Sequence, residues 1–184
     1  MDHTSAVIVS TVSRRRLLQS TIAGGVFALG SSFAFAFSDD GVSKSAESIR
    51  QEVVFKSTPA RVYDALTNAS KFQKVESFSD AAKSLDVAAH PAVISREPGG
   101  TFSLFGGYVT GRQLDLVVNQ RIVQAWRSGS WAPGAYSIVR FDLTEVGGST
   151  KLVLTHGGFP SGTAEHLAEG WHGNYWEPMQ KYLA

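Results

Sequence analysis

The stretch from Gly99 to Trp131 constrains the fold most strongly, because it holds three short apolar runs separated by turn residues. The dipeptides Gly106-Gly107 and Asn119-Gln120 mark the two turns. Period-two alternation within the runs predicts an antiparallel meander with one buried face. In the middle run Leu114, Leu116 and Val118 would share a face, and in the last run Ile122 and Trp126 point away from Val123, Ala125 and Arg127.

Further strands and helices are predicted on both sides of this meander. Residues 49–56 read as a first strand, and Thr58-Pro59 then starts a short helix with Thr58 as its N-cap. Residues 71–83 are predicted to form a second short helix or a helical loop, and a strand is expected around Val93-Ile94. After the meander come two strands, 136–145 and 150–155, joined by a turn at Gly147-Gly148.

The last predicted element is a long helix over residues 161–183. Its apolar stripe at helical spacing consists of Leu167, Trp171, Tyr175 and Tyr182. Asn174 and Pro178 lie on the same side, and Pro178 is expected to kink the helix or to end it locally. The periodicity therefore predicts an amphipathic helix packed over an antiparallel sheet, in an α+β domain.

Several unusual residues occur in an order that resembles a known family. They are Gly99-Gly100, Phe102 to Phe105, Gly107, Gly111, Leu116-Val117, Ile122-Val123, Trp126-Arg127, Trp131, Tyr136, Gly158-Phe159-Pro160, Gly170-Trp171, Tyr175 to Pro178 and Tyr182-Leu183. This pattern resembles the C-terminal type of domain found in activators of heat-shock protein 90 ATPase, within the START-like, helix-grip superfamily. The resemblance implies a curved antiparallel sheet wrapped around the long C-terminal helix, two short helices after the first strand, and a ligand cavity between sheet and helix.

The N-terminal segment predicts an export signal. Ser13 to Leu18 form a twin-arginine pattern, and an uncharged apolar run from Ile22 to Phe37 leads to small residues at Ala34-Phe35-Ala36. The run is shorter than the roughly 20 residues of a membrane-spanning helix, although a retained anchor is the alternative. We therefore expect residues 1–36 to be the signal, 37–48 a flexible linker and 49–184 the START-like domain. The protein would then be periplasmic or secreted, touching a membrane only through an uncleaved signal.

Charge and composition exclude several classes of function. Three of the 17 basic and one of the 16 acidic residues lie in the expected signal, so residues 37–184 carry a net charge of −1. A near-neutral domain without a basic cluster argues against nucleic-acid binding. The chain has no cysteine, which excludes disulfides, thiolate catalysis and thiolate-bound metals. No cofactor, metal ligand set or catalytic residue is assigned.

Some polar residues admit two interpretations. His156, at the end of the last strand, would act as an acid or base at the cavity mouth or be hydrogen-bonded to a loop. Glu165, Glu169 and His172 share one side of the helix, as a metal-binding face or simply a solvated one. Asp115 and Arg127 would form a cross-strand ion pair or line the cavity. Arg140 and Asp142 could equally form an ion pair on the outer face of the sheet.

The aromatic residues suggest where a ligand would bind. The proposed ligand-binding residues, which would otherwise be core packing, are Phe105, Leu116, Trp126, Trp131, Tyr136, Trp171 and Tyr175. The preferred function is binding of a small hydrophobic or amphipathic molecule. The alternatives are a cyclase- or hydrolase-like enzyme using His156 or Arg127 with a cavity tyrosine, and a domain that interacts with a protein partner, as the family name implies.

Overall fold

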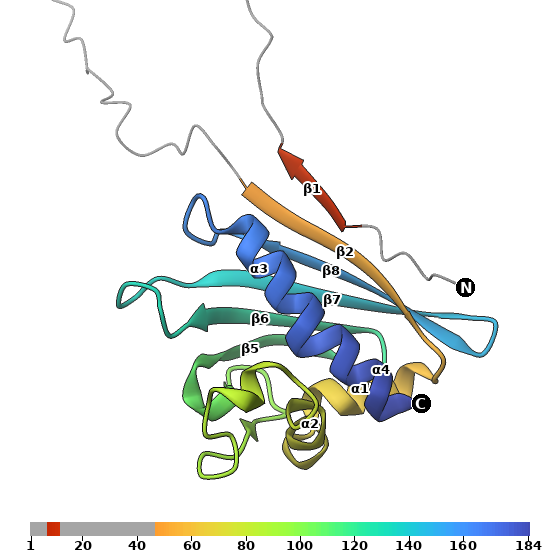
Figure 1. Ribbon diagram of the computed structural model, residues 1–184. Coiled ribbons are helices and arrows are strands. Elements are labelled where there is room, and N and C mark those ends of the chain that lie inside the picture. The colour runs from red at the N-terminus through yellow and green to blue at the C-terminus, as the bar shows by residue number, and fades with distance from the viewer. Residues whose placement is uncertain (1–6, 12–46) are drawn as a thin grey trace, which may run out of the picture.

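The computed structural model describes residues 7–11 and 47–184, which form one antiparallel sheet and a set of helices (Figure 1). The strands are ordered β1-β2-β8-β7-β6-β5-β4-β3 across the sheet. Their bounds are β1 Val7–Thr11, β2 Glu47–Phe55, β3 Val93–Ile94, β4 Thr101–Leu104, β5 Val109–Val117, β6 Arg121–Ser128, β7 Ser137–Val146 and β8 Ser149–Gly157. The predicted meander and the flanking strands are thus confirmed.

Two short helices turn the chain between β2 and β3. Helix α1 covers Pro59–Thr67 and helix α2 covers Ala69–Glu76, and 3-10 turns follow at Ala81–Lys83 and Phe105–Gly107. Thr58 caps α1 as predicted, its hydroxyl accepting a long 3.5 Å bond from the Arg61 N–H. Asn68 ends α1 and also caps α2, because its side chain accepts from the Lys71 N–H at 3.2 Å.

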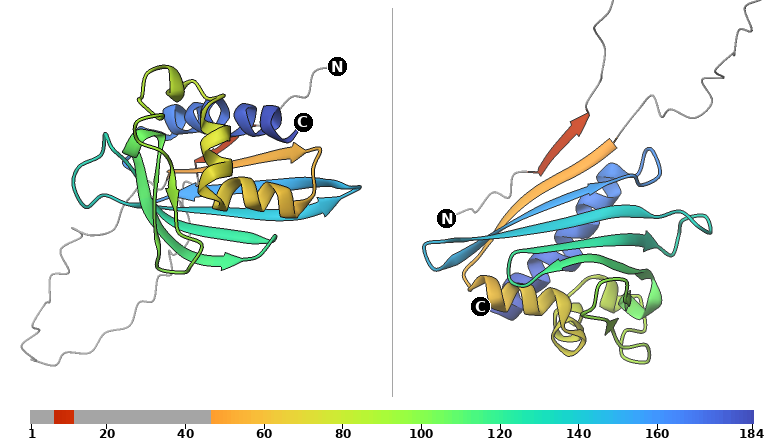
Figure 2. Two further views of the ribbon diagram at one scale, coloured as in Figure 1. Left: turned by 90° about the horizontal axis from the view of Figure 1, so that it is seen from below. Right: turned by 180° about the vertical axis from the view of Figure 1, so that it is seen from behind.

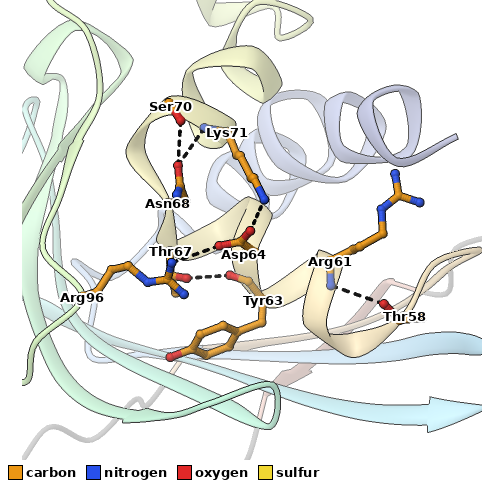
Figure 3. A network of polar contacts seen from close by, with 9 residues as sticks. All are labelled: Thr58, Arg61, Tyr63, Asp64, Thr67, Asn68, Ser70, Lys71 and Arg96. Carbon is orange, nitrogen blue, oxygen red and sulfur yellow. Dashed lines mark hydrogen bonds and ion pairs between the residues drawn. The ribbon is translucent and has the colours of Figure 1, made fainter.

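An ionic contact strengthens the corner between these helices. The Asp64 carboxylate of α1 pairs with the Lys71 ammonium of α2, and its other oxygen lies 3.1 Å from Arg96 (Figure 3). Arg96 precedes β4 in the chain, so Asp64 joins the helical corner to the edge of the sheet. These pairs are partly exposed, and their contribution to stability is small, about 1 kcal/mol or less each.

The C-terminal helix lies across one face of the sheet (Figures 1 and 2). It consists of α3 Ala164–Trp171, a π-helical turn His172–Trp176 and α4 Glu177–Leu183. Pro178 stands in the first turn of α4, where a missing N–H costs least. The local break predicted from Pro178 is therefore realised as a widened turn just before the proline, and the chain continues in the same direction.

A bulge in β5 overturns the predicted burial of the middle run. The register against β6 shifts between Gln113 and Asp115, so the alternation is out of phase beyond that point. Gln113 is fully buried, whereas Leu114 is 47% exposed and Val118 is 65% exposed. The prediction that Leu114, Leu116 and Val118 share one face of the strand is wrong, because Leu114 is the extra residue at the bulge and Val118 lies beyond the end of β5, whereas Leu116 lies opposite the buried Ile122.

The expected N-terminal signal and linker lie mostly outside the described residues. Residues 7–11 form β1, which pairs with β2 from Val7 opposite Gln51 to Thr11 opposite Glu47. Glu47 and Ser48 belong to β2, so the expected linker ends before them. Within the described ranges, no helix is both long enough and apolar enough to cross a membrane.

Gly111 in β5 allows a close approach that no other residue would permit. A Cβ atom at this position would lie 2.1 Å from the Ala125 carbonyl oxygen and 2.4 Å from Cζ of the buried Phe102. Gly111→Ala should destabilise the fold by about 1–3 kcal/mol, because backbone and ring must both move. Urea denaturation would measure this loss, with Gly157→Ala as the control, since a Cβ there meets nothing within 4 Å. Equal stability of the two variants would contradict the prediction.

Candidate functional site

A cavity of about 800 Å³ lies between the sheet and the C-terminal helix. Strands β5 and β6 contribute one wall through residues such as Val109 and Trp126, and α3 with the π turn contributes the opposite wall. The segments around Ala81 and Ala132 close the remaining sides. A cavity of this size accommodates a small organic molecule.

Five of the seven predicted ligand-binding residues meet in the wall of this cavity. They are Phe105, Trp126, Trp131, Trp171 and Tyr175. Their ring centroids lie 4.3 Å apart for Trp171 and Tyr175, 5.3 Å for Phe105 and Tyr175, and 5.4 Å for Trp126 and Trp131. All five side chains are at least nine-tenths buried. The aromatic set therefore forms both a packed cluster and the apolar surface of the cavity.

The other two predicted residues do not line the cavity. Tyr136 precedes β7 and is 53% exposed. Leu116 lies beyond the β5 bulge, near the hairpin to β6, where it pairs with Ile122 and packs against the edge of the core. Leu116 is separated from the cavity end of the hairpin, where Val109 and Trp126 lie, and Tyr136 lies just outside the strand in which it was expected.

Polar residues surround the opening of the cavity. Asp80, Ser84, Ser130 and His166 are exposed and contribute to its lining. Asn174 of the π turn fixes one side of the opening, because its side-chain oxygen accepts from the Ala81 N–H at 2.9 Å. The sequence signal for this role was the amide on the otherwise apolar helix stripe.

His156 lies behind the aromatic wall and connects the helix to the sheet. Its Nδ1 accepts from Trp171 Nε1 at 3.0 Å, and its Nε2 lies 2.8 Å from Ser137 Oγ. An indole nitrogen only donates, so Nδ1 is unprotonated and Nε2 carries the proton. Ser137 Oγ in turn donates to the Trp126 carbonyl at 3.1 Å. The three bonds form a chain that requires a neutral imidazole.

The surroundings of His156 decide between its two predicted roles, and neither is found. The side chain is fully buried, and burial lowers its pKa to about 3. Its partners are a helix tryptophan and a strand serine rather than a loop, and it is absent from the cavity lining. The geometry therefore supports a structural role.

Gln51 of β2 provides a second polar connection to the same helix. Its amide nitrogen donates to the Ala168 carbonyl at 3.0 Å, and its oxygen accepts from Trp176 Nε1 at 2.5 Å. Gln51 is buried between Ile49 and Val53 on the inward face of the strand. Buried amides are stable only when they are paired, so both groups fix the position of the helix on the sheet. Sequence reasoning missed this residue, although a glutamine at an inward position was the signal.

Glu76, at the end of α2, was also missed. Its side chain is fully buried, and Oε1 accepts from the Phe105 N–H at 2.5 Å. Burial raises the pKa of Glu76 to about 7, while the bond from Phe105 acts in the opposite direction. Phe105 has a positive φ of 51°, which is unusual for a residue with a side chain. Glu76 therefore holds a strained residue of the cavity wall in place.

The predicted ion pairs are partly confirmed. Arg140 and Asp142 form the expected pair on the outer face, with Nε and Oδ2 at 2.6 Å. Asp115 and Arg127 do not pair. Asp115 binds Arg121 at 2.7 Å, and Arg127 instead donates to the Trp131 carbonyl at 2.7 Å. In the register of the β5–β6 hairpin Asp115 lies opposite Val123 and Arg127 lies opposite Thr110, so the expected partners are too far apart along the strands.

The acidic and imidazole groups of the C-terminal helix do not converge on one point. His172 Nδ1 lies 3.3 Å from Glu177 Oε1, and Glu165 and Glu169 are exposed. Among residues 7–11 and 47–184, no three His, Cys, Asp or Glu side chains are grouped so that they would hold a metal ion. The metal-face interpretation of this helix has no support in the geometry.

Comparisons with known proteins agree with this architecture. The family model described as Activator of Hsp90 ATPase homolog 1-like protein matches residues 56–184. The human activator of 90 kDa heat shock protein ATPase homolog 1 is 27% identical over 141 residues, which are 77% of this chain and 38% of that protein. The mouse homolog 2 is 31% identical over 93 residues, or 50% of this chain and 28% of that protein. The chain thus spans well under half the length of these relatives.

Solved structures share the fold. An HSP90 activator from Plasmodium falciparum superposes with a TM-score of 0.64 and 24% identity, over 74% of this chain and 95% of that chain. CalU16 from Micromonospora echinospora gives a TM-score of 0.60 and 19% identity, over 76% of this chain and 78% of that one. The predicted helix-grip architecture is confirmed.

The two buried titratable groups predict opposite effects of pH on stability. The folded state favours neutral His156, so its contribution is lost as pH falls from about 6.5 toward 3. The folded state favours neutral Glu76, so its contribution is lost as pH rises from about 4.5 toward 7. Between about pH 4.5 and 6.5 the two slopes, each up to about 1.4 kcal/mol per pH unit, oppose each other.

Glu76→Gln should therefore leave a protein whose free energy of unfolding rises with pH over this interval, and His156→Gln one for which it falls. Urea midpoints at three pH values would measure both slopes. Exposed carboxylates contribute equally to the two variants, so each serves as the control for the other. Slopes of the same sign and size in both variants would contradict the assignment.

Proposed function

Because the chain belongs to the family of Activator of Hsp90 ATPase homolog 1-like proteins, with the helix-grip fold, we propose that it binds a small hydrophobic or amphipathic molecule in the cavity between the sheet and the C-terminal helix. The observation that carries the proposal is the aromatic wall, in which five large rings border a cavity of about 800 Å³ with polar residues at its opening. An apolar interior with a polar rim suits a molecule with an apolar body.

The geometry favours binding over the enzymatic alternative considered from the sequence. His156 is engaged on both ring nitrogens, and Arg127 is engaged by the Trp131 carbonyl. Neither residue contributes to the cavity lining, so neither is placed to exchange a proton with a molecule inside it.

Gly170 of α3 offers a direct test of ligand binding. It lines the cavity, and a Cβ atom there meets nothing within 4 Å. Gly170→Leu should fill part of the cavity and weaken binding of the neutral fluorophore N-phenyl-1-naphthylamine at least tenfold. The fold should keep its stability or gain about 1 kcal/mol, because leucine favours a helix more than glycine does. Fluorescence titration and thermal unfolding would measure the two effects.

Glu169→Leu is the matched control, because it adds the same side chain to the exposed side of α3, away from the cavity lining. It should bind the fluorophore like the wild type. Equal weakening in both variants, or no binding by the wild type, would overturn the proposal.

Interaction with a protein partner is the second candidate function. It is favoured by the relatives, which are named as activators of a heat shock protein ATPase. We propose, however, that the twin-arginine pattern at Ser13 to Leu18 directs the chain out of the cytosol. A chaperone that works with cytosolic ATP would then be out of reach.

Cell fractionation separates these candidates. The full chain should be found in the periplasmic or secreted fraction, and replacing both Arg14 and Arg15 with lysine should retain it in the cytosol. Lys44→Arg, which changes a basic residue outside the pattern, should be exported normally. A wild-type chain in the cytosol would overturn the export proposal and leave the chaperone partner as a candidate, to be tested by its effect on ATP hydrolysis.

A further inference from the structure

Two residues of the aromatic wall bury polar atoms that have no partner. Trp126 Nε1 and the Tyr175 hydroxyl are shielded from water, and neither has a well-formed hydrogen bond within the part of the chain that the structure describes, although the Trp126 N–H lies close enough to the hydroxyl to stabilise its charged form. Both side chains line the cavity, and both are about 95% buried. Leaving a buried donor unpaired costs stability, so two such donors beside one cavity call for an explanation, and a bound molecule that accepts from them is one.

The two groups belong to one polar spot in an apolar wall. Trp126 from β6 and Tyr175 from the π turn both contact the ring of Trp171, with ring centroids at 5.8 Å and 4.3 Å. Burial raises the pKa of Tyr175 far above its usual range, and the adjacent Trp126 N–H only partly offsets this rise. The hydroxyl therefore stays protonated at every physiological pH, so each of the two residues offers one N–H or O–H donor.

Three other polar residues of the lining are engaged with neighbouring groups. Asn174 binds the Ala81 N–H, and Ser128 and Ser130 lie 2.9 Å from each other. Among the described residues, no lysine or arginine contributes to the cavity lining, so the donors near Trp126 and Tyr175 are neutral. A neutral acceptor matches two neutral donors better than a carboxylate does, because a buried carboxylate without a countercharge carries a large desolvation cost.

We propose that the ligand carries a carbonyl oxygen, as in a ketone, ester or amide, attached to its apolar body, and that this oxygen accepts from Tyr175 and Trp126. The inference rests on the proposed ligand-binding function and specifies its chemistry. The aromatic walls contact the apolar body, while the two donors set its orientation through the oxygen. Small rotations of the two side chains bring the shielded donors to the ligand, and the pairing recovers the stability that they lose when unpaired.

A pair of probes isolates the oxygen. Benzophenone and 1,1-diphenylethylene have nearly the same shape and differ in a carbonyl against a methylidene group. The full-length protein should show a ratio of affinities, ketone over alkene, that falls about three- to tenfold in Tyr175→Phe. The hydration of each free probe is the same whichever protein is titrated, so it cancels when the wild type and Tyr175→Phe are compared. The change in the ratio therefore reports the contribution of the Tyr175 hydroxyl. Isothermal titration calorimetry would measure the four affinities.

Tyr136→Phe is the matched control, since it removes a tyrosine hydroxyl outside the cavity and should leave the ratio unchanged. Tyr175→Phe should fold at least as stably as the wild type, because the hydroxyl it removes has no partner. In addition, the indole N–H resonance of Trp126, assigned with Trp126→Phe, should move downfield with benzophenone and not with the alkene.

The outcomes distinguish recognition of a carbonyl oxygen from binding of an apolar molecule in the cavity. If both probes bind and the ratio is the same in Tyr175→Phe, carbonyl recognition is overturned and the apolar binding site remains. If neither probe binds the wild type and N-phenyl-1-naphthylamine also fails, the ligand-binding function itself is overturned. A reduced ratio together with the indole shift would establish the pair of donors.

Discussion

The neutral imidazole of His156 is the constraint on which the packing of helix against sheet depends. It accepts from Trp171 on the helix and reaches Ser137 on β7, which in turn donates to the Trp126 carbonyl on β6. Each bond in this chain has only one workable direction, because an indole nitrogen cannot accept. Gln51 clamps the same helix from β2. Apolar packing alone would let the helix slide along the sheet, whereas these buried bonds define one position.

That fixed position creates the cavity. Trp171 contributes to both, because its indole N–H is bonded to His156 while its ring lies tilted against Tyr175 at the cavity wall. The rings of Trp126 and Trp131 pack against each other on the sheet side of the cavity, opposite Trp171 and Tyr175 of the helix. Glu76 completes the wall by keeping Phe105 in a left-handed backbone conformation. The cavity is therefore a product of rigid aromatic packing and buried polar connections.

The sequence predicted the strands, the short helices and the long helix, because turn dipeptides and apolar periodicity are local signals. Five of the aromatic residues that it singled out line the cavity in the structure. The prediction failed where one residue changes the phase of a strand: the extra residue after Gln113 leaves Leu114 exposed, and the register of the hairpin places Leu116 and Asp115 near its turn, away from Trp126 and Arg127. The sequence also did not reveal the hydrogen-bond partners of the buried residues Gln51, Glu76 and His156. The bonds of Glu76 and Gln51 span about 30 to 125 residues of the chain, and those of His156 depend on which groups face its two ring nitrogens.

The π-helical turn at His172–Trp176 changes the phase of the side-chain pattern between the two halves of the C-terminal helix. One extra residue in this turn rotates the side-chain pattern of α4 relative to that of α3 by about 100°, the rotation of a single helical residue. The cavity-facing side of α3 and the core-facing side of α4, which carries Met179 and Leu183, are thereby set independently. Side chains on the cavity side of α3 can therefore change without altering the register of α4 in the core.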